Sequence, residues 1–270
     1  MDVKKILATF LVVFVAIDVF LAFQWFQIHQ PTANPTATES ILSEMKSDGI
    51  QVGNLDTDSE TGAYIGGQDG NDFLKANMDS LDKRWSTKLT GNQLTATLDK
   101  PVFMGTSRSD VRKSLQKLVN DKTQVIAGTQ YVYDAKLTEY ANNDSDNSAM
   151  VVYTQKMTNR RQFMTSRAQI RFLLDKNHDL KGYTQTYVSN AQVLRDSTTL
   201  ISEEKALIGA YQYNEIPNNG KLNWSHMGYA PLTTVGDDTI FVPAWIFSVT
   251  DGTGNTTLLR INALNGALMK

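Results

Sequence analysis

Apolar residues are most concentrated at the start of the chain. Residues 6–23 form a run of eighteen that is interrupted only by Thr9 and Asp18. As a helix this run is about 27 Å long, close to the ~30 Å thickness of the hydrocarbon core of a bilayer. Together with the aromatic and polar residues that follow, it predicts a transmembrane helix over residues 6–26. A short cytoplasmic N-terminus, residues 1–5, precedes it.

The flanks of this run predict its orientation. Lys4 and Lys5 precede it, and lysines on one flank only place the N-terminus in the cytoplasm, with Trp25 at the outer interface. The alternative is a cleaved signal peptide, whose apolar region is about 7–15 residues long and ends in a small-x-small site. Because the run is longer and continues into QWFQIHQ, an uncleaved anchor is favoured, with the rest of the chain outside the cell.

After the anchor the apolar pattern becomes weaker. Residues 27–37 contain prolines among small polar residues and read as a linker. Residues 38–91 are interpreted as a membrane-proximal section that starts with a short helix, capped by Thr38 or Ser40 and ended by Gly49. The rest of this section is rich in turn residues and is expected to be irregular.

Residues 92–195 alternate clearly between apolar and polar positions and predict a first α+β subdomain. The alternation from residue 94 predicts a strand that Pro101 is expected to close. Ser109 is expected to cap an amphipathic helix. The sequence DKNHD, starting at residue 175, reads as a hairpin loop. Three or four strands are expected within residues 130–140, 149–157, 168–175 and 182–189.

Residues 196–270 repeat this organisation. Ser202 is expected to cap a second helix, whose first turn is acidic. Pro243 lies in the middle of a strand pattern and favours an edge strand. Strands are expected within residues 222–230, 239–249, 256–263 and 267–269. The predicted fold class is therefore α+β, an extracellular part of two subdomains, each a helix followed by an antiparallel meander.

The composition agrees with a folded protein and narrows the function classes. Hydrophobic residues make up 41% of the chain and charged residues 20%, which excludes a collagenous, coiled-coil or wholly disordered chain. The net charge of −2 gives no electrostatic signature of nucleic-acid binding. Because cysteine is absent, a disulfide framework, a thiolate metal site and a cysteine nucleophile are excluded.

Side chains that often carry chemistry are few and scattered. No two of the three histidines have a metal-ligand spacing, and no G-x-S-x-G motif is present. The loop from Asp175 begins like a calcium loop but lacks the glycine and the glutamate that such a loop needs. Glu203 and Glu204 are adjacent, point to different sides, and read as complementing a helix dipole. We therefore expect no enzyme, no catalytic residue, no cofactor and no metal.

Asp18 is the most costly residue of the expected span. A carboxyl group near mid-bilayer costs roughly 2.5–3.5 kcal/mol on insertion scales. Steps of three and four residues from Asp18 define a helix face with two small residues, which suits contact with a partner helix. The alternative is a span that tolerates Asp18 by snorkelling or by deprotonation near the interface. The predicted partner-helix contact consists of Ala8, Leu11, Val15, Asp18, Ala22 and Trp25.

Three parts of the sequence resemble the YycI (WalI) family of bacterial regulatory proteins. They are the leader VKKILATFLVVFVAIDVFLAFQWF, then ESILSEMKSDGIQVGNL followed by AYIGG, and the C-terminal strands with RINALNGALM. The last part also resembles the closing hairpin of PepSY-type modules. The resemblance extends in layout over nearly the whole chain.

This resemblance implies a non-enzymatic Gram-positive membrane protein with residues 6–26 in the lipid bilayer. It would pair outside the cell with a YycH-like protein and regulate the essential cell-wall sensor kinase YycG, also called WalK, through transmembrane-helix and ectodomain contacts. The competing hypothesis is a stand-alone wall-side binding or protease-inhibiting module of PepSY type. An anchored wall hydrolase is disfavoured because no catalytic constellation is visible.

Overall fold

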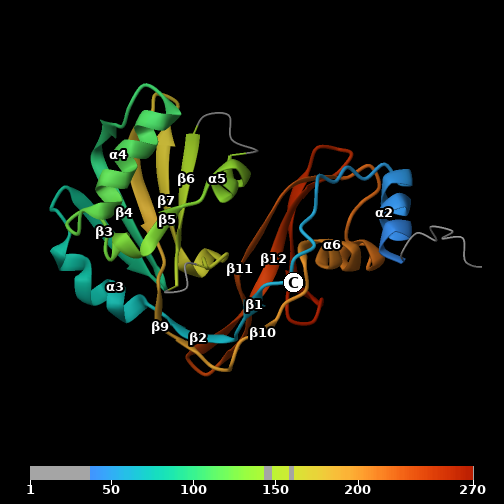
Figure 1. Ribbon diagram of the computed structural model, residues 1–270. Helices are drawn as coiled ribbons and strands as arrows, with labels where there is room; N and C mark the ends of the chain where they lie inside the picture. Colours follow the sequence, from blue (N-terminus) through green and yellow to red (C-terminus); the bar gives the residue numbers. More distant parts are fainter. Residues whose placement is uncertain (1–36, 143–147, 158–160, 270) are drawn as a thin grey trace, which may run out of the picture. The chain divides into compact units, whose positions relative to one another are not determined.

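The computed structural model describes residues 37–142, 148–157 and 161–269 (Figure 1). The predicted transmembrane helix over residues 6–26, the linker and all six residues of the predicted partner-helix contact lie outside these ranges. In the described ranges, no helix is long and apolar enough to cross a membrane. The chain divides into two compact units, residues 1–43 and residues 44–270, and the second contains both sheets.

Helix α2 (Ala37–Ser47) confirms the short helix that was predicted after the linker. It starts ahead of both expected capping residues, so that part of the prediction was wrong. Gly49 follows the helix with a φ of +74°, and its N–H donates to the carbonyl of Lys46 at 3.1 Å. A glycine in this left-handed conformation is a common helix end, because it has no Cβ to clash.

Sheet I is antiparallel and takes strands from widely separated parts of the sequence. Its strand order is β14-β13-β12-β2-β9, with β11 paired to β12. From β11 to β14 each strand pairs with the next one in the chain, which is the meander predicted for the C-terminal part. The strands are β2 (Ile65–Asp69), β9 (Val188–Val193), β11 (Lys221–Val235), β12 (Asp238–Thr250), β13 (Thr256–Asn262) and β14 (Leu268–Met269).

Sheet II is also antiparallel and has the strand order β3-β4-β8-β7-β6-β5. Its strands are β3 (Trp85–Thr90), β4 (Gln93–Phe103), β5 (Tyr131–Tyr133), β6 (Ser148–Gln155), β7 (Gln169–Asp175) and β8 (Asp179–Gln185). The loop between β7 and β8 confirms the predicted hairpin. A separate two-stranded ladder pairs β1 (Thr61–Gly62) with β10 (Thr198–Thr199).

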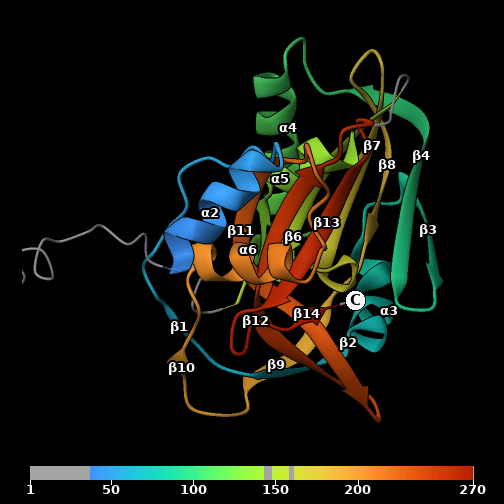
Figure 2. The ribbon, with the colours of Figure 1, turned by 90° about the vertical axis from the view of Figure 1, so that its right-hand side faces the viewer.

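One helix covers a face of each sheet. Helix α4 lies on sheet II (Figure 1), where Val111 and Leu115 share a core with Phe172. Helix α6 lies along sheet I (Figure 2), and the indole N–H of Trp245 donates to the carbonyl of Ile201 at 2.9 Å beside it. The helices are α3 (Asn71–Asn77), α4 (Arg108–Asn120), α5 (Ala135–Ala141) and α6 (Glu203–Gln212), with 3-10 turns η1 (Met78–Ser80), η2 (Gly128–Gln130) and η3 (Ser166–Ala168).

The two sheets share a hydrophobic cluster, which we call the intersheet cluster. Ile246 of β12 belongs to this cluster together with Val152 of β6. The face of sheet I that includes Ile246 is therefore turned towards sheet II. The cluster consists of the buried residues Leu137, Val152, Met164, Ala230, Ala244 and Ile246. It fixes which faces of the two sheets meet.

Helix α4 begins two residues earlier than predicted. Its N-cap is Ser107, whose hydroxyl oxygen accepts the N–H of Asp110 at 3.2 Å. The Ser107 hydroxyl also donates to the Asp110 carboxylate at 2.7 Å. This reciprocal pair satisfies two polar groups at the helix start, which gives Ser107 an advantage over Ser109.

The stretch over residues 130–140, predicted as a strand, divides into strand β5 and helix α5. Asp134 caps the helix, since its carboxylate accepts the N–H of Leu137 at 2.8 Å. The prediction was wrong in the second half because the alternation of apolar residues continued into a segment that a capping aspartate turns into a helix. Ser202, by contrast, is confirmed as the N-cap of α6.

Neither proline has the predicted effect: Pro101 does not end its strand, and Pro243 does not lie in an edge strand. Pro101 lies inside β4, within the break in pairing with β8 between Thr97 and Val102. Pro243 lies in β12, which is a central strand and not an edge. On one side of Pro243, pairing with β2 stops at Phe241 and pairing with β13 begins at Ala244.

On the other side of Pro243 lies Tyr229 of β11. The N–H of Tyr229 donates to Gln162 and its carbonyl accepts from Met164, each at 2.8 Å, so these groups point away from β12. The missing N–H of Pro243 therefore costs the sheet no hydrogen bond.

The section over residues 38–91 is more regular than predicted. It contains β1, β2, α3, η1 and β3, and it supplies strands to both sheets. Residues 182–189, predicted as one strand, end β8 in sheet II and begin β9 in sheet I. The chain crosses between the sheets there, a change of partner that an alternating pattern does not encode.

Candidate functional site

The segment between α2 and sheet I is held in place by residues that are distant in sequence. We call this segment, residues 51–64, the strap. At its start, the N–H of Gln51 donates to Gly220 at 2.8 Å and the carbonyl of Gln51 accepts from Leu222 at 2.9 Å. At its end, β1 pairs with β10. Between these ends the strap is largely exposed and irregular, so side chains from elsewhere determine its path.

Glu203, the first residue of α6, holds the middle of the strap. Its side chain is buried, and one carboxylate oxygen accepts the backbone N–H of Asp56 at 3.0 Å. The other oxygen accepts the hydroxyl of Ser225 in β11. The N–H of Glu204 donates in turn to the carbonyl of Asp56 at 3.2 Å. A buried carboxylate is costly unless it is hydrogen-bonded, and the strap amide supplies one of the two donors.

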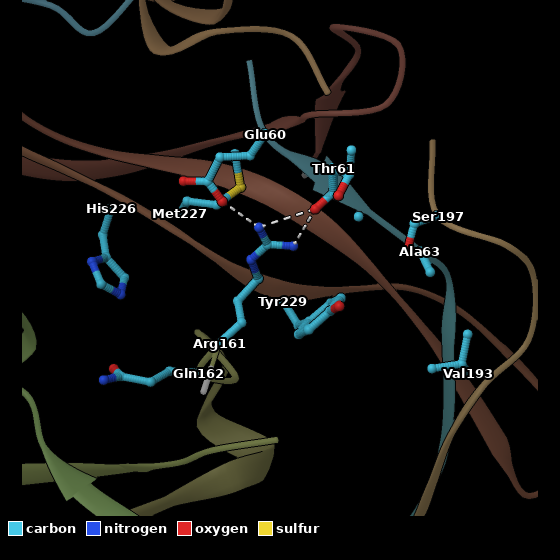
Figure 3. A pocket seen from close by; sticks show the side chains of 11 residues that line it. Glu60, Thr61, Ala63, Arg161, Gln162, Val193, Ser197, His226, Met227 and Tyr229 are labelled. Carbon is cyan, nitrogen blue, oxygen red and sulfur yellow. Dashed lines mark hydrogen bonds and ion pairs between the residues drawn. The ribbon is translucent and has the colours of Figure 1, made fainter. Parts of the chain in front are cut away.

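Arg161 holds the end of the strap in a cavity of about 620 Å³. Figure 3 shows its guanidinium between the strap and β11. The guanidinium pairs with the carboxylate of Glu60 and donates to the carbonyl of Thr61 at 3.2 and 3.3 Å. Its carbon lies 5.8 Å from the centre of the Tyr229 ring, a cation–π distance. The Arg161 side chain is only 12% exposed, so this ion pair is shielded on one side.

His226 of β11 lines the same cavity (Figure 3). Burial lowers the pKa of His226 below its ordinary value of 6.5, while Asp134 acts to raise it and Lys136 to lower it. The ring is therefore neutral at pH 7. One carboxylate oxygen of Asp134 is buried without a hydrogen-bond partner in the described residues.

Together these contacts connect the strap to both sheets. The ammonium of Lys136, in α5, donates to the backbone carbonyl of Ser225. The hydroxyl of Ser225 donates to Glu203, and Glu203 accepts the strap amide of Asp56. Arg161 comes from the segment that follows β6 of sheet II and reaches the strap independently. The arrangement holds one segment of backbone, the strap, against its neighbours.

Asp175 and His178, which the sequence analysis considered as possible ligands, form hydrogen bonds within the fold instead. The carboxylate of Asp175 accepts the N–H groups of Asp179 and Asn177, which hold its pKa below the ordinary value. His178 contacts the carbonyl of Gly105 at 3.0 Å. Within the described residues, no group of three or more His, Asp or Glu side chains is placed to hold a metal ion.

Sequence reasoning missed Arg161 and underestimated Glu203. Glu203 was interpreted only as a charge at a helix start, and its strap partner lies 147 residues earlier. Arg161 lies 101 residues from Glu60. The only local indication of these contacts was the polar Glu203 directly before the apolar face of α6. Contacts between residues so far apart in the sequence leave no periodic pattern.

The fold defines an α+β protein with antiparallel sheets. The same fold is found in an uncharacterised protein from Eubacterium rectale ATCC 33656, at 9% identity and a TM-score of 0.50, over 82% of this chain and 89% of that one. The chain is also similar to YycH from Bacillus subtilis (12% identity, TM-score 0.45, 84% of this chain and 61% of that one). A third similar structure is the YpeB C-terminal domain of Bacillus megaterium (14% identity, TM-score 0.37, 88% and 96% coverage).

The family is given by the sequence. The model of the YycI protein family matches residues 29–264, and the chain belongs to this family. The family implies a role in regulating the YycG two-component system and association with the YycG/YycH system, and its members are typically membrane-anchored. No match was found among curated proteins.

Proposed function

We propose that the chain is a non-enzymatic, single-pass membrane protein that regulates the sensor histidine kinase YycG (WalK) together with YycH. The match of the YycI family over residues 29–264 carries this proposal. The apolar run over residues 6–26 and the preceding lysines support a cytoplasmic N-terminus and an extracellular C-terminal part. Within that part we assign the two α+β subdomains to sheet II and sheet I rather than to residues 92–195 and 196–270, because β3 belongs to sheet II while β2 and β9 belong to sheet I.

In this proposal the strap links ectodomain contacts to the membrane helix. It follows α2 in the chain and is held by Glu203 and Arg161, which belong to different parts of the fold. A partner that shifts either residue would loosen the strap, and the chain N-terminal to it would then be less constrained. The transmembrane contact through residues such as Asp18 would receive that change.

The test is purification of the full-length chain from membranes, with its partners identified and the output of the kinase regulon measured. We expect YycG and YycH to co-purify, and deletion of the chain to change kinase output. Arg161→Gln should change output while both partners still co-purify; the exposed Arg84 provides the matched control, Arg84→Gln. If neither partner co-purifies and deletion leaves output unchanged, the proposal is wrong.

The alternative is a stand-alone wall-side module of PepSY type, which binds a ligand or inhibits a protease. The closing β13–β14 hairpin supports keeping it as an alternative: Asn262 accepts the N–H of Leu264 at 2.9 Å, and Gly266 has a φ of +75°. Inhibition of a wall protease by the purified full-length chain, in the absence of YycH and YycG, would favour this alternative.

A further inference from the structure

A second cavity, of about 520 Å³, lies between the facing sides of the two sheets. We call it the intersheet groove. One wall comes from α5, β6 and β7 of sheet II, and the other from β12, β13 and β14 of sheet I. Ile246, Arg260 and Met269 lie opposite one another across β12, β13 and β14, so they share the face that forms this second wall. The groove shares no lining residue with the strap cavity.

The floor of the groove is apolar and adaptable. Four members of the intersheet cluster line it, and partly buried Leu258 packs against them. Three methionines also line the groove: Met150, Met164 and Met269. Methionine side chains are unbranched and polarizable, and surfaces rich in them adapt to different apolar partners. A ligand therefore gains affinity here by burying apolar side chains.

Two arginines line the groove, one in each wall. Arg171 extends from β7 and Arg260 from β13. In the described part of the chain neither guanidinium forms a salt bridge. Arg171 donates to the side-chain oxygen of Gln169 at 2.9 Å, and burial lowers the pKa of Arg171. A guanidinium that lines an apolar groove without a carboxylate partner favours an anionic group, and its planar donors match a carboxylate.

We propose that the intersheet groove binds an extended peptide segment of a partner protein in which acidic side chains alternate with apolar ones. The apolar floor would accept the apolar side chains, and Arg171 and Arg260 the carboxylates. The cavity volume lies within the roughly 300–1,000 Å³ range of sites that enclose most of a ligand. Because strands wall the groove on both sides, an occupant must insert between them, which suits a single extended segment better than the flat surface of a bilayer.

The test is a selection from a library of displayed twelve-residue peptides on the purified full-length chain, counter-selected on the Arg171→Gln/Arg260→Gln double variant. We expect the enriched peptides to carry Asp or Glu between apolar residues. Synthetic copies with those acids changed to Asn or Gln should bind at least tenfold more weakly to the unmodified chain. The Arg84→Gln variant is the matched control and should bind like the unmodified chain.

A charge swap separates recognition from a loss of folding. In the Arg171→Glu/Arg260→Glu variant, copies of the peptides with Lys in place of the acids should bind more tightly than the acidic originals. The proposal is overturned if acidic and amide peptides bind equally, or if the lysine peptides gain nothing on the charge-reversed variant. Binding of phosphatidylglycerol vesicles that depends on both arginines, with no peptide enriched, would also overturn it, in favour of a lipid ligand.

Discussion

At the residue scale, buried polar side chains join parts of the chain that the sheets leave apart. Glu203 satisfies both of its carboxylate oxygens with groups outside its own helix, the amide of Asp56 and the hydroxyl of Ser225. The guanidinium of Arg161 likewise contacts groups distant in sequence, the carboxylate of Glu60 and the carbonyl of Thr61. Such contacts contribute orientation more than bulk stability, because each replaces hydrogen bonds that water would make in the unfolded chain.

Replacing Glu203 should release the strap without unfolding the sheets. A hydrogen bond to a charged group contributes about 1.5–3 kcal/mol, and each ~1.4 kcal/mol is a factor of ten. We expect Glu203→Ala to speed hydrogen exchange of the strap amides at least tenfold in the full-length chain. Glu204→Ala is the control, because the Glu204 side chain makes no hydrogen bond in the described residues. Equal exchange in both variants would show that the Glu203 contact does not hold the strap.

The start of α4 gives a prediction with a defined pH dependence. The hydroxyl of Ser107 lowers the pKa of Asp110 from its ordinary value of 3.8, followed by smaller contributions from Thr106 and Lys113. A carboxyl with a lowered folded-state pKa stabilises the fold above its unfolded value and loses that effect as the pH falls through the folded value. The stabilisation from Asp110 is therefore complete at neutral pH and is lost in acid below 3.8.

We expect Ser107→Ala to move the pKa of Asp110 upwards, as followed by an NMR titration of the carboxyl group. The same titration on Ser109→Ala should match the unmodified chain, since Ser109 lies inside the helix and does not cap it. A pKa shift in Ser109→Ala instead would place the cap at the position that the sequence favours.

At the scale of elements, the sequence predicts periodic segments well and their partners poorly. Strand β7 follows from alternation, since a half-buried strand exposes every second residue, whereas β12 is buried along nearly its whole length and is marked by its apolar composition. Helix α5 was missed because its cap, Asp134, depends on one side-chain hydrogen bond. The place of Pro243 in a central strand depends on Tyr229 turning its polar groups towards Gln162 and Met164, and no local pattern predicts that.

The contact between η2 and α4 is set by the absence of a side chain. A Cβ added at Gly128 would overlap the backbone carbonyl of Val119, which cannot move without disturbing the end of α4. Overpacking costs about 1–3 kcal/mol, and ~1 kcal/mol shifts Tm by about 2–4 °C in a domain of this size. We expect Gly128→Ala to lower Tm by roughly 5–10 °C in a thermal denaturation.

Gly209 provides the matched control, because it lies inside α6 and a Cβ there would meet nothing within 4 Å. Gly209→Ala should raise Tm slightly, since alanine favours a helix interior by about 0.5–1 kcal/mol over glycine. A Gly128→Ala variant as stable as the unmodified chain would mean that η2 and α4 do not pack as described.

For the whole molecule, the fold class followed from the sequence because each sheet contains a meander of neighbouring strands. The way the sheets share strands did not follow, since β2 and β9 join sheet I from outside residues 196–270. The strap and its two anchoring residues were likewise invisible, as their contacts span more than a hundred residues. The transmembrane helix over residues 6–26 is predicted from the apolar run of the sequence, and it is open to direct test.

That test concerns Asp18 and the helix face predicted around it. If Asp18 hydrogen-bonds to a partner helix, Asp18→Leu should weaken the complex while improving insertion. Interhelical hydrogen bonds in membranes average about 0.6 kcal/mol and reach ~1.7 kcal/mol, so we expect a loss of about 3- to 20-fold in co-purification with the kinase. Ala22→Leu should act in the same direction, because it blocks close approach of the backbones.

Val13→Leu is the control, since it lies about 140° around the helix from Asp18. Output of the kinase regulon is measured beside co-purification, because a weakened helix contact should change both. If Asp18→Leu and Ala22→Leu match the unmodified chain in both measurements, the span serves only as an anchor. The regulatory contact would then have to be made by the ectodomain, where variants at Arg161 and Glu203 should retain their effects.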